Sequence, residues 1–425
     1  MTSSPSSQEP TSLGVHLVGS APFPSTSTAF REHALGLPSR LKRIPDGETG
    51  ERHYFTAFQA GKFSAAPEVL VDFTDNQDSQ RKDFTVEEVK AAAEKLEAKG
   101  GIETGYDVAA NESYSVFRKL KEEGVIPKDV KFQVGIPSYV LPRCDCFLPQ
   151  AQPNNARFVI RRRVASTIGP MINHAFQPAL EPLYEASLFR ALQNIQAAIP
   201  HDQLSIQLDL AVDMGFWEGQ YLTPWFAQGE GANAVREYIV AYVGRMMARI
   251  EEDVELGVHF CYGDMAHKHF YEPPTTLAIT SLLTHMLVFP HRISYIHFPI
   301  PVSAQTSLPT FLAPLTDITP TLMEKGLEVY PGVVQFDDEK GTRERIAAVT
   351  RACPGLNFGV ATECGWGRTP EEQIGGIMEL LTLLEFGGRI LRARRSGKRD
   401  SGEKEGNEVM RSKPCDVKRE TEPEP

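Results

Sequence analysis

The chain has 425 residues, of which 41% are hydrophobic and 23% charged, so it is long enough to bury a large core. Its formal net charge of −11 at pH 7 argues against sequence-independent binding to nucleic acid, which needs a surplus of lysine and arginine. No apolar run has the length of about 18 residues that spans a membrane, and the first residues lack the apolar core of a signal peptide. Six cysteines in a chain of this length do not predict a disulfide framework, so we expect a cytoplasmic protein.

The two ends of the chain differ in composition from the rest. Residues 1–12 are rich in Ser, Pro and Thr, and residues 392–425 are charged and nearly devoid of large apolar side chains. Such segments cannot bury enough apolar surface to offset the entropy lost on ordering. We therefore predict a disordered N-terminus, one folded domain over residues 13–391 and a disordered charged tail.

Short apolar and β-branched runs recur between these ends, most of them bounded by Gly, Pro or Asp, as is typical of strands. In chain order, these eight predicted strands are 14–19, 40–47, 130–137, 204–212, 257–263, 293–301, 327–337 and 357–365. Helical patterns fill most of the gaps, at 86–98, 113–124, 182–199, 234–255, 274–288, 341–352 and 370–391.

Strands that alternate with helices predict a parallel sheet, and eight such units predict a single closed (β/α)₈ TIM barrel. An open doubly wound sheet is the alternative, but no Gly-rich GxGxxG loop opens a helix after a strand. The segments 48–129 and 138–203 are long for strand-to-helix connections. We therefore expect long loops with extra helices after the second and third predicted strands, over the mouth of the barrel.

Chemistry in such barrels takes place at the C-terminal ends of the strands. The stretch "VHFCYGD" places His259 and Cys261 two residues apart, so both side chains point the same way. Val258 and Phe260 are the natural contacts with the helices, which leaves His259 and Cys261 facing the lumen. The same alternation and the strand ends predict further polar residues there: Asp46, Glu48, Asp209, His297 and Cys364.

One histidine and two cysteines suit Zn²⁺, and three protein ligands with an open fourth position mark a catalytic zinc site. On its own, the pair His259 and Cys261 is more often a core histidine beside a buried thiol. Cys364, at the end of another predicted strand, adds a third potential ligand and so favours the zinc site. Cys144 and Cys146 form a second C-x-C pair, but no histidine lies near them in the sequence.

Several segments resemble the catalytic domain of the cobalamin-independent methionine synthases. "VHFCYGD" resembles the H-x-C-Y zinc segment of that family, and "GVATECGWGRTPEE" resembles the segment around its last zinc cysteine. "LVGSAPFPST", "PDGETGERHYF" and "SIQLDLAV" are similar to three further segments in the same order. The resemblance covers residues 13–391 and extends to the superfamily that includes uroporphyrinogen decarboxylase.

This resemblance implies zinc-dependent transfer of an alkyl (methyl) group from a donor to a small-molecule thiol, with zinc holding the thiol as the nucleophile. It implies His259, Cys261 and Cys364 as ligands. The family's glutamate ligand is not evident, and His297 stands in its place as the expected fourth ligand. The motif "LDLAVDMGF" keeps Asp209 but not the Glu-Pro that follows it in the family, which leaves a folate donor open.

The resemblance also implies a substrate pocket. Glu48 and Asp209 are expected to hold the ammonium group of an amino-thiol, and Ser20 is expected to bind its carboxylate through the hydroxyl. From the residues alone, Glu48 fits a turn residue and Asp209 a core hydrogen-bonding group equally well.

Further candidates follow the predicted strands. His267, with Asp264 before it, is a candidate general acid for the leaving group, although loop histidines are more often simply solvated. Trp217 is a candidate wall of an aromatic pocket, or a packing residue. Arg368 is a candidate clamp for an acidic group, or a partner of Glu363.

Three functions are compatible with these residues. The first is zinc-dependent alkyl transfer to a thiol. The second is a metal-free lyase of the uroporphyrinogen decarboxylase type, which gives His259, Cys261 and Cys364 no role. The third is a catalytically degenerate barrel that serves as a binding protein. Metal content separates the first from the other two.

Overall fold

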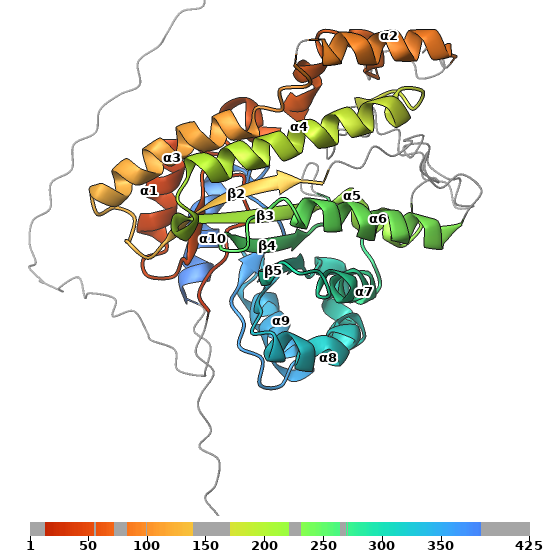
Figure 1. Cartoon of the computed structure of the whole chain (residues 1–425). Helices are drawn as coiled ribbons and strands as arrows, with labels where there is room; N and C mark the ends of the chain where they lie inside the picture. Colours follow the sequence, from red (N-terminus) through yellow and green to blue (C-terminus); the bar gives the residue numbers. More distant parts are fainter. Residues whose placement is uncertain are drawn as a thin grey trace, which may run out of the picture. The chain divides into compact units, whose positions relative to one another are not determined.

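A computed structural model of the chain describes residues 13–54, 57–71, 83–98, 100–138, 171–220, 231–263, 269 and 271–383. These residues form an α/β fold around one curled, seven-stranded parallel sheet, in which the strands follow one another in sequence order (Figure 1). The predicted parallel sheet is therefore confirmed. Its strands are β1 (Arg43–Pro45), β2 (Lys131–Pro137), β3 (Leu204–Leu210), β4 (Glu255–Phe260), β5 (Ile293–Pro299), β6 (Glu328–Val334) and β7 (Ala361–Thr362).

The first of the eight predicted strands, at 14–19, is not formed among the described residues. Gly14 has a φ of 85°, outside the β region, and only Val15 makes bridges. Val15 bridges in parallel to Leu41, just before β1, and to Val360, just before β7. The segment that begins the described chain therefore lies between the two edges of the sheet. The predicted strand at 357–365 shortens to the two residues of β7.

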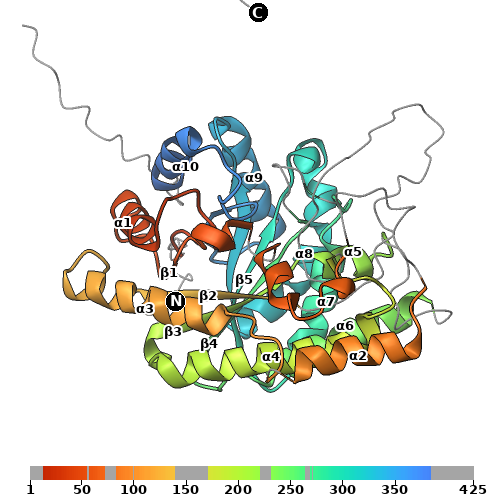
Figure 2. The ribbon, with the colours of Figure 1, turned by 90° about the horizontal axis from the view of Figure 1, so that it is seen from above.

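Helices cover the outer face of the sheet (Figure 1). They are α1 (Thr26–Gly36), α2 (Val86–Glu97), α3 (Tyr106–Glu122), α4 (Gln177–Ala198), α5 (Val212–Trp217), α6 (Ala232–Met247), α7 (Leu277–Met286), α8 (Leu308–Glu324), α9 (Glu339–Ala352) and α10 (Glu371–Leu383). Shorter 3₁₀ turns are η1 (Gly50–Tyr54), η2 (Ala57–Phe63), η3 (Pro67–Val69), η5 (His201–Gln203) and η7 (Val302–Thr306). Figure 2 shows α1 and α10 side by side, which brings the first and last described helices into contact.

Three of these helices, α1, α5 and α8, were not predicted from the sequence, and α8 shows why. It contains Pro314 and Pro320, which remove backbone hydrogen bonds and therefore count against a helix. The apolar stripe that includes Phe311, Leu312 and Leu315 is buried, and this tertiary packing maintains the helix. The other unpredicted helices are α1, which begins after the N-cap Ser25, and the short α5, which follows β3 directly.

The connection between β1 and β2 contains η1 to η3 and the helices α2 and α3. Helix α2 begins with a capping box, in which the Thr85 hydroxyl accepts a hydrogen bond from the Glu88 amide and the Glu88 carboxylate accepts one from the Thr85 amide. Helix α2 packs along α4 (Figure 2). The expected long loop before α4 falls mostly on residues outside the described ranges.

The N-terminal ends of the strands are joined by a partly buried ionic cluster. Arg43, the first residue of β1, donates hydrogen bonds to Glu255 of β4 and Glu328 of β6. Its guanidinium group also stacks 3.9 Å from the centre of the Tyr295 ring. This cluster forms a floor beneath the lumen, and the C-terminal ends of the strands lie above it. No helix of the described part is both long enough and apolar enough to cross a membrane.

Candidate metal centre

His259, Cys261 and Cys364 converge at the C-terminal ends of β4 and β7. The Sγ atoms of Cys261 and Cys364 lie 3.8 Å apart, and Cys364 Sγ lies 3.9 Å from His259 Nε2. All three potential ligand atoms lie within 4.8 Å of one another. His259 and Cys261 are buried and Cys364 is half-buried, so the group is accessible from one direction.

Local structure explains this convergence. Val258 and Phe260 are fully buried in the hydrophobic core, and the alternation along β4 leaves His259 on the opposite face. The Cys261 amide donates to Leu210 O at 2.8 Å, which continues the pairing with β3 one residue beyond the strand. The Gly263 amide donates to Cys261 Sγ at 3.3 Å, so the backbone that follows the strand holds the sulfur in place.

Cys364 is positioned by a turn that follows β7. The Thr362 hydroxyl donates to the Cys364 carbonyl at 2.8 Å and accepts from Trp366 Nε1 at 2.9 Å. The Trp366 amide in turn donates to the carbonyl of Ser20 at 2.5 Å. The turn is thereby fastened to the end of the segment that contains Val15.

The donor set and its spacing fit a zinc ion. Two Zn–S bonds of about 2.3 Å at a tetrahedral angle place their sulfur atoms about 3.8 Å apart, which is the distance between Cys261 Sγ and Cys364 Sγ. Both cysteines are free thiols. Two thiolates and an imidazole nitrogen are ligands that zinc prefers over magnesium or calcium.

His297, the expected fourth ligand, is not one of the three residues whose ligand atoms converge. It lies beside His259 on β5, and the two Nδ1 atoms are 2.7 Å apart. Its Nε2 atom lies 2.9 Å from the carbonyl oxygen of Thr362. Burial lowers the pKa of His297 to about 4, although the Thr362 carbonyl opposes the shift. Burial also holds the pKa of His259 well below its usual range.

Two buried carboxyl groups lie next to this cluster. Asp209 pairs in register with His259, and Glu48 lies beyond the end of β1. Burial raises the pKa of Glu48 to about 8, with a further contribution from Asp46 and opposition from Arg52. Burial and the charge of Glu48 raise the pKa of Asp209 well above its usual range. Burial therefore disfavours the ionised form of both carboxyl groups.

The backbone at Glu48 is in an unusual conformation. Its φ is 48°, in the left-handed region that side chains other than glycine rarely adopt. The Glu48 amide donates to Asp46 Oδ1 at 2.9 Å, and Asp46 is held in turn by Arg52 at 2.6 Å and by the Ser113 hydroxyl at 2.6 Å. Such conformations cost about 1–3 kcal/mol and cluster at functional sites.

Ser20 and Arg368 also belong to this region. A Cβ atom at Gly365 or Gly367 would lie 2.7–2.8 Å from Ser20 Oγ, so the turn packs directly against Ser20. Arg368 Nη2 lies 4.0 Å from Cys364 Sγ, and its charge opposes the raised pKa of Glu48. The structure thus brings both residues to the cluster side of the fold.

The remaining predicted residues lie elsewhere or outside the described ranges. Trp217 is buried at the end of α5, where its ring packs against His285 of α7 and the guanidinium of Arg236 of α6. The described contacts of the Trp217 ring are therefore all with residues of the helices. Asp264 and His267 lie outside the described residues.

Some residues that face the lumen were not predicted from the sequence. Gln207 Nε2 donates to Asp209 Oδ1 at 2.8 Å, and Gln207 Oε1 accepts from the Nε2 atom of buried His16 at 2.9 Å. Gln207 lies two residues before Asp209, so the alternation that placed Asp209 in the lumen also predicts Gln207 there. Thr362, two residues before Cys364, could have been found in the same way.

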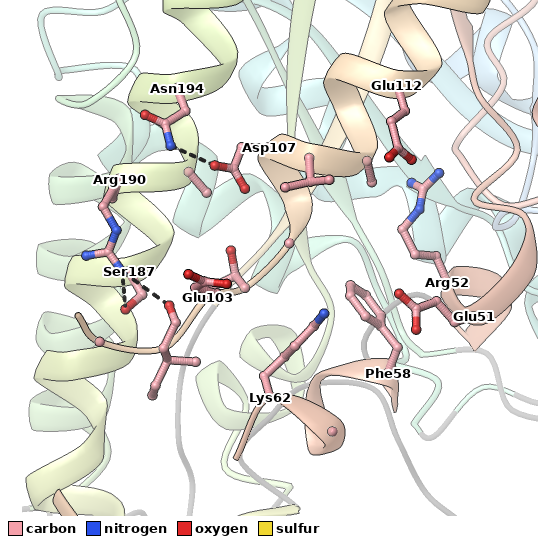
Figure 3. Close-up of a pocket in the computed structure, with 18 of the residues that line it drawn as sticks. Glu51, Arg52, Phe58, Lys62, Glu103, Asp107, Glu112, Ser187, Arg190 and Asn194 are labelled. Carbon is pink, nitrogen blue, oxygen red and sulfur yellow. Dashed lines mark hydrogen bonds between the residues drawn. The ribbon is translucent and has the colours of Figure 1, made fainter. Parts of the chain in front are cut away.

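A separate cavity of about 1110 Å³ lies between η1, η2, α3 and α4 (Figure 3). Lys62 points into it, and Asp107 accepts a hydrogen bond from Asn194 at its edge (Figure 3). None of the three converging ligand residues lines it. Arg52 is shared, because it lines this cavity and also binds Asp46 beside Glu48.

Comparisons with known proteins add a distant likeness. No protein-family model and no curated protein matches the chain. Among solved structures, a B12-independent methionine synthase from Shewanella sp. W3-18-1, in complex with selenomethionine, is 15% identical with a TM-score of 0.30. The match covers 48% of this chain and 53% of that protein, about half the length of each. A likeness of this degree carries no argument about function, which rests on the site itself.

Proposed function

We propose that the chain is a zinc enzyme that transfers an alkyl group to the thiol of a small amino-thiol. The observation that carries this proposal is the convergence of His259 Nε2, Cys261 Sγ and Cys364 Sγ at tetrahedral spacing. Three protein ligands leave one position of a tetrahedral ion free for a substrate atom. A zinc ion held there would supply Lewis-acid chemistry, which lowers the pKa of a bound thiol so that it reacts at neutral pH.

The residues around the cluster suit the rest of an amino-thiol. Glu48 and Asp209 are buried carboxyl groups with raised pKa values, so an ammonium group between them would relieve their mutual repulsion. Ser20 and Arg368, on the same side, are suited to bind the carboxylate of the substrate. These side chains would orient the substrate sulfur towards the three ligands.

The alternatives explain less of the site. A metal-free lyase gives the three converging donors no role, and a ligand-binding protein needs no strained Glu48 backbone beside them. Both remain outcomes of the test below.

The test uses purified full-length protein loaded with zinc, and homocysteine as the first thiol. Binding should add a third sulfur neighbour in the X-ray absorption spectrum and release about one proton per chain. Propanethiol, which lacks the amino and carboxyl groups, is the control and should bind more weakly. Incubation with methyl donors, including a methylfolate, followed by mass spectrometry of the thiol, measures turnover.

The outcomes separate the three functions. Alkylated thiol supports the proposal. Thiol binding at the metal without product from any donor indicates a binding protein. If the zinc content is negligible, or if no thiol perturbs the metal, alkyl transfer at this site is rejected.

A further inference from the structure

The contact between His259 and His297 is an unusual one for a metal-binding histidine. Both rings are fully buried, on adjacent strands and in register, and their Nδ1 atoms lie 2.7 Å apart. At this distance one nitrogen must carry a hydrogen and the other must be bare, because two N–H groups or two lone pairs would repel each other. The partners of the other ring nitrogens show which Nδ1 atom carries the hydrogen.

The Thr362 carbonyl settles the assignment. A carbonyl oxygen only accepts, so His297 Nε2, at 2.9 Å from it, carries the hydrogen. A neutral imidazole has one N–H, so His297 Nδ1 is bare and accepts. His259 Nδ1 therefore carries its own hydrogen, and His259 Nε2 is left bare. This is the nitrogen that lies 3.9 Å from Cys364 Sγ.

We propose that His297 is a positioning residue, which fixes His259 as the tautomer whose Nε2 lone pair faces the two cysteines, and is not itself a metal ligand. The proposal rests on the metal site proposed above. It departs from the expectation that His297 supplies the fourth ligand, because both of its nitrogens already have partners.

The same ring also ties together the two strands that supply the ligands. His297 contacts His259 of β4 on one side and the Thr362 carbonyl of β7 on the other, two residues before Cys364. Outer partners of this kind orient metal-binding histidines in general, and here one side chain positions two parts of the ligand set. The ring centre of His16 is 5.5 Å from that of His297, and the Nε2 atom of His16 is paired with Gln207.

Two substitutions separate the roles of the two nitrogens. His297→Leu removes both, whereas His297→Asn keeps an acceptor oxygen close to the place of Nδ1. His291→Leu is the matched control, because His291 is buried just before the same strand with its nitrogens on the Arg292 and Glu251 carbonyls. Thermal unfolding of each variant checks that it is folded.

Two measurements are needed: the affinity for metal, and the tautomer of His259 in metal-free protein. Affinity for Co²⁺ and Zn²⁺, from competition with a chelator, should fall about 10- to 100-fold in His297→Leu. His297→Asn should recover most of the affinity, and His291→Leu should retain it. In metal-free protein labelled with ¹⁵N-histidine, the His259 resonances are identified by their loss in His259→Gln. They should show the Nδ1–H tautomer in the native protein and a mixture of the two tautomers in His297→Leu.

The results distinguish this inference from the proposed function. Native protein that binds no metal but shows the locked Nδ1–H form rejects the metal site and leaves the pairing of the rings intact. Unchanged metal affinity and an unchanged His259 tautomer in His297→Leu overturn the inference alone. X-ray absorption that loses a nitrogen neighbour in His297→Leu, while Zn²⁺ remains bound, would make His297 a ligand and also overturn it.

Discussion

The ring of Tyr295 on β5 occupies the space that a side chain at Gly257 on β4 would need. The two residues are register partners, and a Cβ atom at Gly257 would overlap the ring. The ring cannot easily move away, because Arg43 stacks on it and its hydroxyl lies 3.3 Å from the Ser205 hydroxyl. Gly257 is thus required for the lumen to close below His259.

We predict that Gly257→Ala destabilises the protein by about 1–3 kcal/mol, the usual cost of overpacking a core. Urea unfolding measures the change. Gly375→Ala is the matched control, because Gly375 lies within α10 with no atom within 4 Å of an added Cβ. That substitution should raise stability by up to about 1 kcal/mol. Equal effects at the two glycines would contradict the role given to Tyr295.

Protein purified without added metal should contain one zinc ion per chain. Cys261→Ser and Cys364→Ser should each reduce the content to below about a tenth of an equivalent, because the loss of a thiolate weakens such sites severely. Cys353→Ser is the control, since Cys353 is also a buried free cysteine but lies at the end of α9. Elemental analysis decides. Full zinc content in Cys261→Ser would remove that residue from the ligand set.

Asp209→Asn should weaken homocysteine binding by roughly 1.5–3 kcal/mol, the range for a hydrogen bond to a charged group, and leave the zinc content unchanged. Propanethiol, which has no ammonium group, should bind both proteins equally. Calorimetric titration measures each affinity.

Asp213→Asn is the control for this prediction. Asp213, in the first turn of α5, is another buried aspartate, and burial raises its pKa to about 6. Its carboxylate accepts a hydrogen bond from the Ser138 hydroxyl, just after β2. It should leave homocysteine affinity unchanged. Unchanged affinity in Asp209→Asn would show that the ammonium group binds elsewhere.

Glu48 should make the protein less stable as the pH rises. Burial raises its pKa from 4.5 to about 8 in the folded state. Between these values the folded protein holds a proton that the unfolded chain has released, so the free energy of unfolding falls with rising pH. The stabilising contribution is complete below pH 4.5 and is lost above about pH 8.

Urea unfolding across this pH range should therefore show a smaller downward slope in Glu48→Gln than in the native protein. Glu68→Gln is the control, because Glu68 is an exposed carboxylate paired with Lys95. Its removal should leave the slope unchanged. The same slope in Glu48→Gln and in native protein would show that Glu48 is already ionised in the folded state.

The sequence predicted the parts of this site that depend on local periodicity. The alternation of Val258 and Phe260 with His259 and Cys261 placed the last two on the lumen face, and the parallel order of the strands brought Cys364 to the same end. Both inferences need only the period of a strand and the direction of the chain.

Other features depend on partners that are remote in the chain. The role of His297 is set by Thr362, and the place of Val15 is set by its bridges to Leu41 and Val360. Helix α8 forms in spite of its prolines because its apolar face is covered by its neighbours. Residue propensities and sequence spacing do not predict these contacts, because the contacts form only when the curled sheet brings distant segments together.

The two bridges of Val15 have a consequence for how the centre assembles. They join Leu41 to Val360 across nearly the whole described chain, so the contact between the two edges of the sheet forms only after both ends of the described chain have met. Contacts so distant in sequence form late in folding. A metal ion bound by His259, Cys261 and Cys364 would then hold the end of β4 and the turn after β7 together. Removing it with a chelator should lower the melting temperature and speed hydrogen exchange at the amides of Val15 and Val360, with less effect at the β2–β3 pairing.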